Sequence, residues 1–396
     1  MASTHTNITP ATEAPAKGSL LVSLASLPAN ALETTLANLA LAFPSQSVLV
    51  ATPDPAPQLS SGSPLRLLPY TPAAPSTTPW FLTAADYVNT FKLVQENGAS
   101  ACLLLGAESQ SLHPDAIRSL AAAAASTDLV VSHYNLRPRE GLVNSAILYP
   151  VTRGLFGSSP RFPLAIDLAL SPRMAERLAA SAQKFTAASQ GDALIWPITE
   201  AVIANYSIAE ADAGTRTFPQ PSADLNTLLT QIAGSLFSDV DAKASFWQRG
   251  RSFKPGRSFP QTIDPADGSS DIASMLETFR LAYTNLHEIW SLILPPNSLL
   301  GLKRLSVMPP DAFRIPDALW SRIVYDFILA YRLRTINRGH LLGALTPLYL
   351  AWVASHLTLV NNGTAPEAHV QEIAAAFEAD KPYFVSRWRW PDRFNP

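Results

Sequence analysis

Residues 100–111, with the sequence SACLLLGAESQS, decide how the fold of this chain is read. The apolar residues 101–105 predict a short buried strand, because a continuous apolar run of this length between turn residues is typical of a strand covered on both faces. The strand leads into a small polar turn that contains Gly106 and presents one carboxylate, Glu108. The segment therefore predicts a central strand with an acidic residue just after its carboxyl end.

Strands and helices alternate on both sides of this segment. An apolar strand pattern at residues 20–26 is followed by a helical pattern at 30–42 and a strand pattern at 47–51. After the turn, Pro114 opens another predicted helix, and a strand pattern follows at residues 128–132. This alternation favours an α/β fold of the Rossmann-like, doubly wound kind, with a sheet covered by helices.

Residues 52–79 contain eight prolines. Proline cannot donate a backbone hydrogen bond and is excluded from helix interiors and central strands. We therefore expect a long surface connection in this part of the chain.

The second half of the chain is predominantly helical in pattern, and three regions are predicted. Residues 1–18 are rich in Thr, Ala and Pro without a signal-peptide pattern, and we expect a disordered leader there. Residues 19–215 are expected to form the α/β domain, and residues 216–396 a helical C-terminal region. The most apolar window, residues 341–360, contains proline and polar residues, and we expect a buried helix rather than a transmembrane segment.

Composition limits the classes of function. The chain has 396 residues, 47% of them hydrophobic, and a net charge of −2 with only 15% charged residues. That balance argues against nucleic acid as a partner. The single cysteine, Cys102, lies in an apolar run, so a disulfide framework and a cysteine zinc site are excluded. A reducing, cytoplasmic setting fits best, and the oligomeric state is left open.

Two stretches carry a resemblance to a known family. They are residues 149–157, YPVTRGLFG, and residues 161–171, RFPLAIDLALS. They resemble a pattern found in GT-A-fold glycosyltransferases, in the bacterial family-2-like group that includes glucosyl-3-phosphoglycerate synthase and mannosylglycerate synthase. The resemblance implies a mixed, mainly parallel sheet with flanking helices. It also implies transfer of a hexose from a nucleotide diphosphate sugar to a small polar or acidic acceptor.

The same resemblance implies where the donor would bind. Gly106 and Glu108 stand where the family has a metal-binding Asp-X-Asp, so this motif is degenerate. One carboxylate makes a poor ligand set for Mg²⁺ or Mn²⁺, and we expect Glu108 to form a weak metal site or none. Ser26 and Asp54, at the ends of the first two strands, are expected nucleotide contacts. Arg216 is a candidate cation for the diphosphate.

Acceptor and catalytic residues are predicted on the later segments. Arg153 and Arg161 are expected acceptor contacts, since guanidinium groups present a planar fork of donors. Asp167 and Glu200 are the candidate general bases. The structural alternative is that Arg153 and Asp167 form a buried pair that only stabilises the turn. A basic loop at residues 249–257 is a second candidate for phosphate contact.

A second class of function stays open. Several predicted active-site positions depart together from the family pattern, which is also what a catalytically inactive glycosyltransferase-like binding or assembly protein would show. A dinucleotide-dependent enzyme is disfavoured, because no Gly-X-Gly-X-X-Gly follows the first strand.

Overall fold

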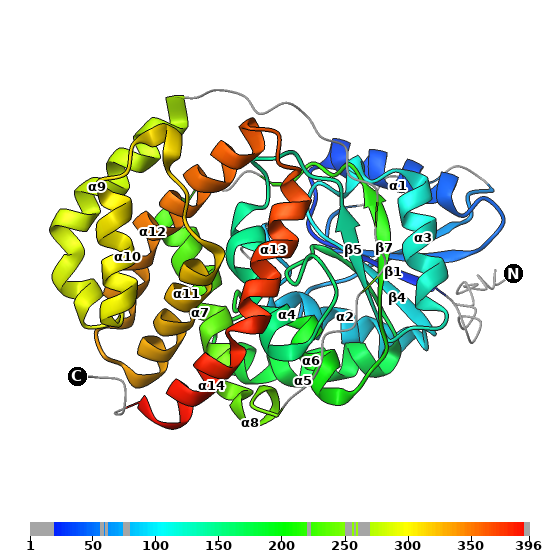
Figure 1. Cartoon of the computed structure of the whole chain (residues 1–396). Helices are drawn as coiled ribbons and strands as arrows, with labels where there is room; N and C mark the ends of the chain where they lie inside the picture. Colours follow the sequence, from blue (N-terminus) through cyan, green and yellow to red (C-terminus); the bar gives the residue numbers. More distant parts are fainter. Residues whose placement is uncertain are drawn as a thin grey trace, which may run out of the picture.

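A seven-stranded sheet lies in the right half of the molecule as drawn in Figure 1, with helices on both of its faces. The computed structural model describes residues 20–391 except 56–58, 60–61, 74–79, 220–222, 250–255, 257–258 and 260–269. The strand order is β3-β2-β1-β4-β6-β5-β7, and every neighbouring pair is parallel except the two that involve β6. The predicted α/β class, with a mixed and mainly parallel sheet and a helical C-terminal region, is confirmed.

The described elements have the following bounds. The strands are β1 (Leu20–Leu24), β2 (Val48–Thr52), β3 (Leu65–Pro69), β4 (Ala101–Leu105), β5 (Leu129–Tyr134), β6 (Asp167–Leu170) and β7 (Ile208–Gly214). The helices that accompany the sheet are α1 (Ala29–Ala42), α2 (Ala84–Asn97), η1 (Ser109–Ser111), α3 (Pro114–Ala124), η2 (Asn144–Leu148), α4 (Tyr149–Phe156), α5 (Pro172–Ala187) and α6 (Pro197–Ala204). The later helices are α7 (Leu225–Ala242), α8 (Ala244–Trp247), α9 (Ser270–Ser291), α10 (Pro296–Ser306), η3 (Pro310–Ala312), α11 (Asp317–Leu333), α12 (Arg338–Asn361), α13 (Pro366–Ala379) and α14 (Lys381–Arg389).

The strand β4 is central, as the sequence predicts. It pairs in parallel with β1 and antiparallel with β6, so that Leu103 lies between Val22 and Ala169. Residues 102–105 are buried on both faces of the strand. Helices cover both faces of the sheet, which explains why these strands are continuously apolar rather than alternating.

The proline-rich stretch differs from the prediction, because it contains the edge strand β3. This strand pairs in parallel with β2, with Leu67 opposite Val50, and it is only partly buried. The strand β3 ends at Pro69 on the edge of the sheet. Proline has no backbone N–H to donate, and at an edge there is no further strand that would need that hydrogen bond. The prolines therefore restrict the strand to the edge of the sheet and do not prevent it.

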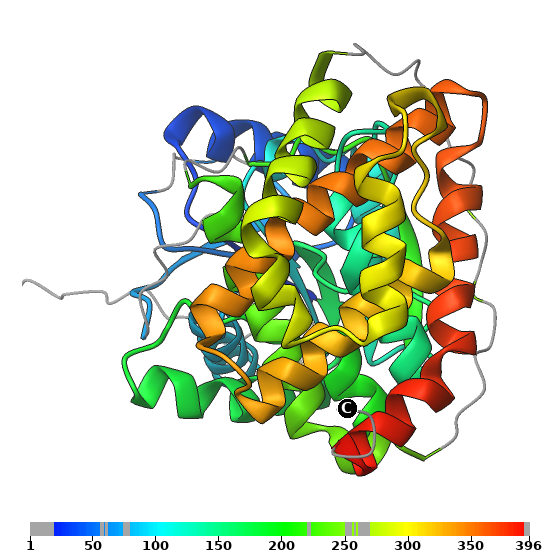
Figure 2. The ribbon, with the colours of Figure 1, turned by 60° about the vertical axis from the view of Figure 1, so that its left-hand side comes forward.

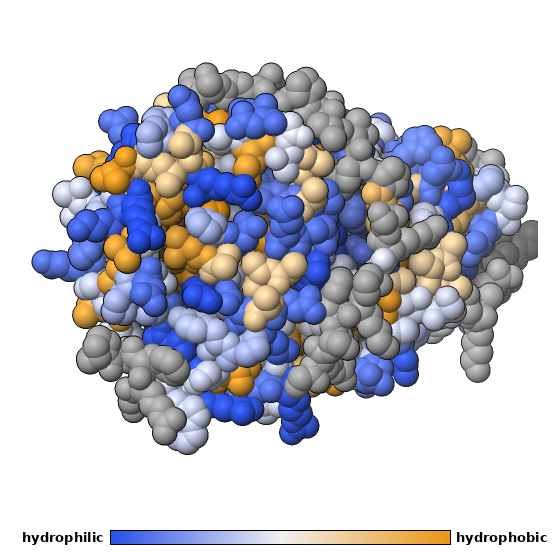
Figure 3. Space-filling view, viewed as in Figure 1, coloured by the Kyte–Doolittle hydropathy of each residue, from blue (hydrophilic) through white to orange (hydrophobic). Residues whose placement is uncertain are grey.

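The C-terminal helices pack as a layer beside the sheet, with α12 running through the middle of that layer (Figure 2). Within the described residues, α12 is the one helix whose length and composition would let it cross a membrane, and 72% of its most apolar window is buried inside the fold. The prediction of a buried helix at residues 341–360 is confirmed. On the face in Figure 3, apolar side chains occur in small groups between hydrophilic ones.

One hydrophobic core runs through both halves of the chain. Trp320 of α11 donates its indole N–H to the carbonyl of Ala146 in η2 at 2.8 Å. A Cβ atom on Gly154 of α4 would lie 2.7 Å from the hydroxyl of Tyr325, so this close approach of α4 to α11 requires a glycine. The boundary at residue 215 stays a prediction, and the leader expected at residues 1–18 lies outside the described residues.

Candidate functional site

Several predicted site residues come to one edge of the sheet. The strands β2, β1, β4 and β6 are consecutive in the sheet, and β6 runs opposite to the other three. The carboxyl ends of β2, β1 and β4 and the amino end of β6 therefore lie at the same edge. This edge carries Asp54, Ser26, Glu108 and Asp167, and ligands of open α/β sheets bind at such an edge.

Asp54 ties the ends of the first two strands together. Its Oδ1 accepts a hydrogen bond from the hydroxyl of Ser26 at 2.7 Å, and its Oδ2 accepts one from the backbone N–H of Leu27 at 2.6 Å. Ser26 is exposed and Asp54 is half-buried. Each carboxylate oxygen can accept two hydrogen bonds, so this pair retains capacity for a ligand.

The turn after β4 has no room for a side chain at position 106. A Cβ atom on Gly106 would lie 2.7 Å from the backbone oxygen of Ile166, because the segment before β6 passes directly over this position. Glu108 adopts the left-handed backbone conformation, with φ of 61°, and its Oε2 accepts a hydrogen bond from the side chain of Gln110 at 2.6 Å. Packing thus excludes a side chain at position 106.

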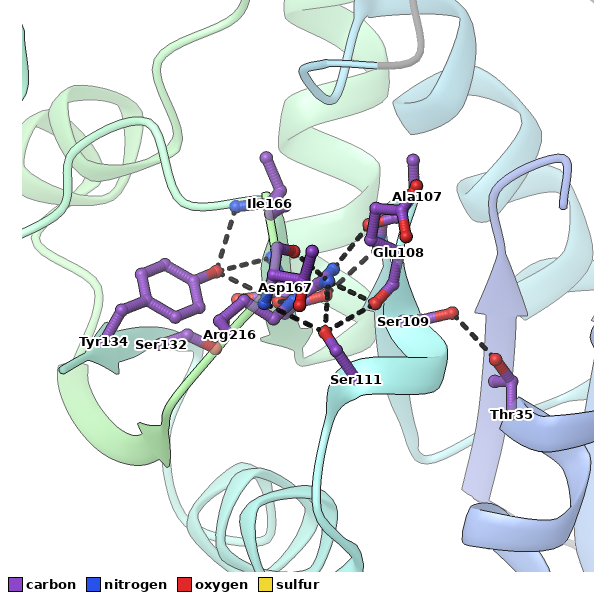
Figure 4. Close-up of polar contacts among 12 residues, drawn as sticks. Thr35, Ala107, Glu108, Ser109, Ser111, Ser132, Tyr134, Ile166, Asp167 and Arg216 are labelled. Carbon is purple, nitrogen blue, oxygen red and sulfur yellow. Dashed lines mark hydrogen bonds and ion pairs between the residues drawn. The ribbon is translucent and has the colours of Figure 1, made fainter. Parts of the chain in front are cut away.

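A buried ion pair lies beneath this turn (Figure 4). The Arg216 Nε donates to Asp167 Oδ2 at 2.8 Å, and both side chains are fully buried. The remaining donors of Arg216 reach the carbonyls of Ala107, at 2.6 Å, and Glu108, and the hydroxyl of Ser111 at 3.0 Å. Arg216 therefore holds the 106–108 turn onto the start of β6.

The carboxylate of Asp167 is saturated by its neighbours. Its Oδ1 accepts from the backbone N–H of Gly106 and from Arg216, each at 3.2 Å. Its Oδ2 accepts from the hydroxyl of Tyr134 at 3.1 Å as well as from Arg216. Burial, together with the Asp167 charge, holds the pKa of Tyr134 well above its usual value, so the hydroxyl stays a donor.

Arg216 keeps its positive charge in this buried position. Burial alone would lower the pKa of Arg216, but the adjacent Asp167 carboxylate more than offsets this and raises it. The structural alternative that paired Arg153 with Asp167 is wrong, because Asp167 pairs with Arg216 instead. Whether Asp167 and Arg216 act on a ligand stays a prediction.

The described residues do not fit a Mg²⁺ or Mn²⁺ site. No group of three or more His, Cys, Asp and Glu side chains among them could hold a metal ion. Such hard cations need several oxygen ligands. The Asp167 oxygens are already occupied, and the guanidinium of Arg216 lies against the carbonyls of Ala107 and Glu108.

The two arginines predicted to bind the acceptor, Arg153 of α4 and Arg161 of the segment between α4 and β6, both contact α13. Arg153 donates to the side-chain oxygen of Gln371 at 2.6 Å and lies 3.5 Å from the Glu378 carboxylate. Arg161 pairs with Glu367 at 3.0 Å. Both guanidinium groups are buried, and carboxylates of α13 balance their charges.

Glu200 lies apart from the other predicted site residues. It pairs with Lys243 at 2.8 Å and with Arg177 at 3.0 Å, in a separate cavity of about 530 Å³ between α5, α6 and α7. Burial opposes its ionisation, yet Lys243 and Arg177 hold the pKa of Glu200 below its usual value. A lowered pKa makes Glu200 a weak base.

Sequence reasoning missed a cavity of about 320 Å³ beside the Asp167–Arg216 pair. Tyr134, Asn144 and Phe218 contribute to its wall. One feature of the sequence indicated this cavity, the position of Tyr134 at a strand end. The other lining residues come from segments far apart in sequence. The cations of the basic loop other than Arg249 lie outside the described residues.

No family model and no curated protein matches the chain. Among solved structures, it is similar to glucosyl-3-phosphoglycerate synthase from Mycobacterium tuberculosis in complex with phosphoglyceric acid, at 13% identity, over 63% of this chain and 88% of that chain, with a TM-score of 0.34. The same enzyme with Mn²⁺, uridine diphosphate and phosphoglyceric acid aligns at 13% identity over 57% and 78% of the two chains, also at 0.34. A mycobacterial protein aligns at 12% identity over 64% and 81%, with a TM-score of 0.35. TM-scores below 0.5 leave the function to be judged from the residues of this chain.

Proposed function

We propose that this protein is a glycosyltransferase that moves a hexose from a nucleotide diphosphate sugar to an acceptor hydroxyl group. The observation that carries this proposal is the convergence of Ser26, Asp54 and Glu108 at the carboxyl ends of three neighbouring strands. The sequence resemblance predicted donor contacts at these positions. A cytoplasmic setting and a bacterial origin remain predictions of the same resemblance.

The open side of this edge has the polar groups that a nucleotide needs. Asp54 retains acceptor capacity for ribose or base donors, and the Ser26 hydroxyl is exposed beside it. Glu108 is half-buried, and its Oε1 accepts no hydrogen bond from the described residues. These groups would bind and orient the donor without a long-range basic field.

The transfer we propose does not depend on a divalent cation at the 106–108 turn. The acceptor oxygen forms a bond to the anomeric carbon while the bond from that carbon to the diphosphate breaks. The nucleoside diphosphate leaves with the electron pair, and the proton of the acceptor hydroxyl group passes to solvent. Arg216 stabilises the turn from beneath as a fixed cation, which is a positioning role.

A second function is favoured by a specific observation. Asp167, Glu200, Arg153, Arg161 and Arg216 all lie in ion pairs within the protein. A protein that keeps the fold and uses these pairs only for stability would be a catalytically inactive binding or assembly protein. Such a protein would bind a nucleotide or a partner without breaking the sugar–phosphate bond.

Donor hydrolysis and donor binding separate these two functions. We would incubate the full chain with UDP-, GDP- and ADP-hexoses, with and without EDTA, and measure released nucleoside diphosphate. The transferase predicts release that EDTA does not change and that Glu108→Ala abolishes. Glu96→Ala, an exposed carboxylate at the far end of α2, is the matched control and should retain full activity.

Two outcomes would decide against the transferase. Binding of a nucleotide sugar by calorimetry without any release would favour the inactive binding protein. If no nucleotide binds at all, the hypothesis of a donor site is wrong.

A further inference from the structure

The cavity beside the Asp167–Arg216 pair is lined mainly by apolar side chains. Aromatic rings and aliphatic side chains from the β5–η2 segment, the segment before β6, α7 and α12 surround its volume of about 320 Å³. Trp80, Leu142, Phe162, Phe218 and Ile232 are among them. A cavity of this size lies at the lower end of the range for small-molecule sites.

Tyr134 connects this cavity to the edge of the sheet. Its ring lines the cavity, and its hydroxyl donates to Asp167. Phe218 packs edge-on against the Tyr134 ring, with centroids 5.1 Å apart, and follows Arg216 by two residues. The cavity therefore lies next to the predicted donor edge, separated from the Asp167–Arg216 pair by one aromatic ring.

The cavity wall contains one buried acceptor that the described residues leave unsatisfied. Asn144 is 8% exposed, and its side-chain N–H group donates to the carbonyl of Arg161 at 2.8 Å. Its Oδ1 has no hydrogen-bond partner among the described residues. A buried unsatisfied acceptor is unfavourable, and a ligand with one donor would relieve this. Asn144 also begins a π-helical turn, a distortion that frequently marks functional sites.

Charge around the cavity argues against an acidic ligand. Arg139, in the cavity wall, pairs with Asp271 at 2.6 Å. Behind the cavity lining, Arg161 pairs with Glu367, and Arg216 pairs with Asp167. A carboxylate or phosphate placed here would lose its hydration and compete with these existing partners.

We propose that this cavity binds an uncharged molecule that combines an apolar ring system with a hydroxyl donor for Asn144 Oδ1. Resting on the proposed function, this molecule is the acceptor. A hydroxyl oxygen of the ligand bonds to the anomeric carbon, the nucleoside diphosphate leaves with the electron pair of the broken bond, and the hydroxyl proton passes to solvent. This apolar alcohol differs from the small polar or acidic acceptor that the sequence resemblance implies.

The first test is binding of 1-naphthol to the full chain by calorimetry. We expect binding at one site, and loss of at least tenfold in affinity for Leu228→Trp, which fills the cavity from α7. Leu225→Trp makes the same change on the same helix at an exposed position, and it should retain the wild-type affinity. Equal affinity of 1-naphthol for the wild type and Leu228→Trp would overturn the proposal.

A second comparison tests the hydrogen bond to Asn144. We expect 1-methoxynaphthalene, which lacks the donor, to bind the wild type about three- to tenfold more weakly than 1-naphthol. In Asn144→Leu the two compounds should bind alike. Displacement of 1-naphthol by glycerate or 3-phosphoglycerate would contradict the exclusion of acidic ligands and overturn the proposal.

Folding of each variant is checked by circular dichroism. If Leu228→Trp does not fold, Phe218→Ala decides in its place, because it opens the cavity wall and should weaken 1-naphthol binding several-fold. An unchanged affinity there would overturn the proposal. Nucleotide-sugar titration of the same samples separates the transferase hypothesis from the hypothesis of this cavity site. Binding of 1-naphthol without binding of a nucleotide sugar would overturn only the transferase. Binding of a nucleotide sugar without binding of 1-naphthol would overturn only the cavity site.

Discussion

The open edge, with Ser26, Asp54 and Glu108 after β1, β2 and β4, differs from the closed cluster of Asp167 and Arg216, although the sequence singled out charged residues in both. At the open edge, Ser26 is exposed and Asp54 keeps acceptor capacity. In the closed cluster, Asp167 and Arg216 are fully buried and use their polar atoms on each other and on the backbone. The difference shows that a charged residue at a predicted site can stabilise the site without facing a ligand.

The largest effect should come from opening the closed cluster with Arg216→Ala. This change leaves the Asp167 carboxylate buried without its cation, and breaking such a pair costs about 3–5 kcal/mol. Urea denaturation followed by circular dichroism measures the free energy of unfolding. Arg118→Ala, which removes an exposed ion pair with Asp115, is the control and should cost less than about 1 kcal/mol. A similar small loss for Arg216→Ala would show that the cluster is not structural.

An acidic side chain at position 106 should destabilise the protein rather than create a metal site. Gly106→Asp places a Cβ atom within 2.7 Å of the Ile166 backbone oxygen, and we expect a loss of about 1–3 kcal/mol. Gly106→Ala should already show most of this loss, because the collision begins at the Cβ atom. Thermal unfolding and Mn²⁺ titration by calorimetry test this. A stable Gly106→Asp protein with gained Mn²⁺ affinity would contradict the packing argument.

A buried histidine pair between α12 and α13 should confer sensitivity to acid. His356 of α12 stacks on His369, with its Nδ1 2.7 Å from that of its neighbour, and burial followed by the charges of His369 and Arg161 lowers the pKa of His356 to about 3. A histidine whose pKa is lowered by folding contributes stability above its unfolded pKa of about 6.5, and that stability is lost as the pH falls from there toward 3.

Between pH 7 and pH 5 we expect a loss of about 1–2 kcal/mol attributable to His356. Urea denaturation at both pH values measures it, and His356→Gln should reduce the difference between them. An identical pH dependence in His356→Gln would assign the acid sensitivity to other groups.

The smallest effect on stability is expected at the open edge. Ser26→Ala removes an exposed hydrogen bond to Asp54, and we expect a loss within about 0.5–1 kcal/mol. Nucleotide-sugar affinity should fall several-fold in the same variant, measured by calorimetry. Thr34→Ala, an exposed hydroxyl on α1, is the control and should leave affinity unchanged. A stability loss without any change in affinity would show that Ser26 stabilises the fold and does not contact the donor.

Much of the fold could be predicted, because the apolar runs and helical spacings are local patterns. The strand β4 and the buried helix α12 lie where those patterns placed them. The edge strand β3 was missed, since prolines mask a strand that needs only one neighbour. The partner of Asp167 was also missed. Arg216 lies 49 residues away in sequence, and no local signal links the two.

The amino-acid sequence by itself determined the α/β class, the central strand at residues 101–105 and the presence of a single acid after it. Only the tertiary structure decided which charged residues face outward. The direction of β6 brings Ile166 over Gly106, and the chain after β7 returns Arg216 to Asp167. Burial and pairing depend on which strands become neighbours, and strand order is a property of the whole fold rather than of any one segment.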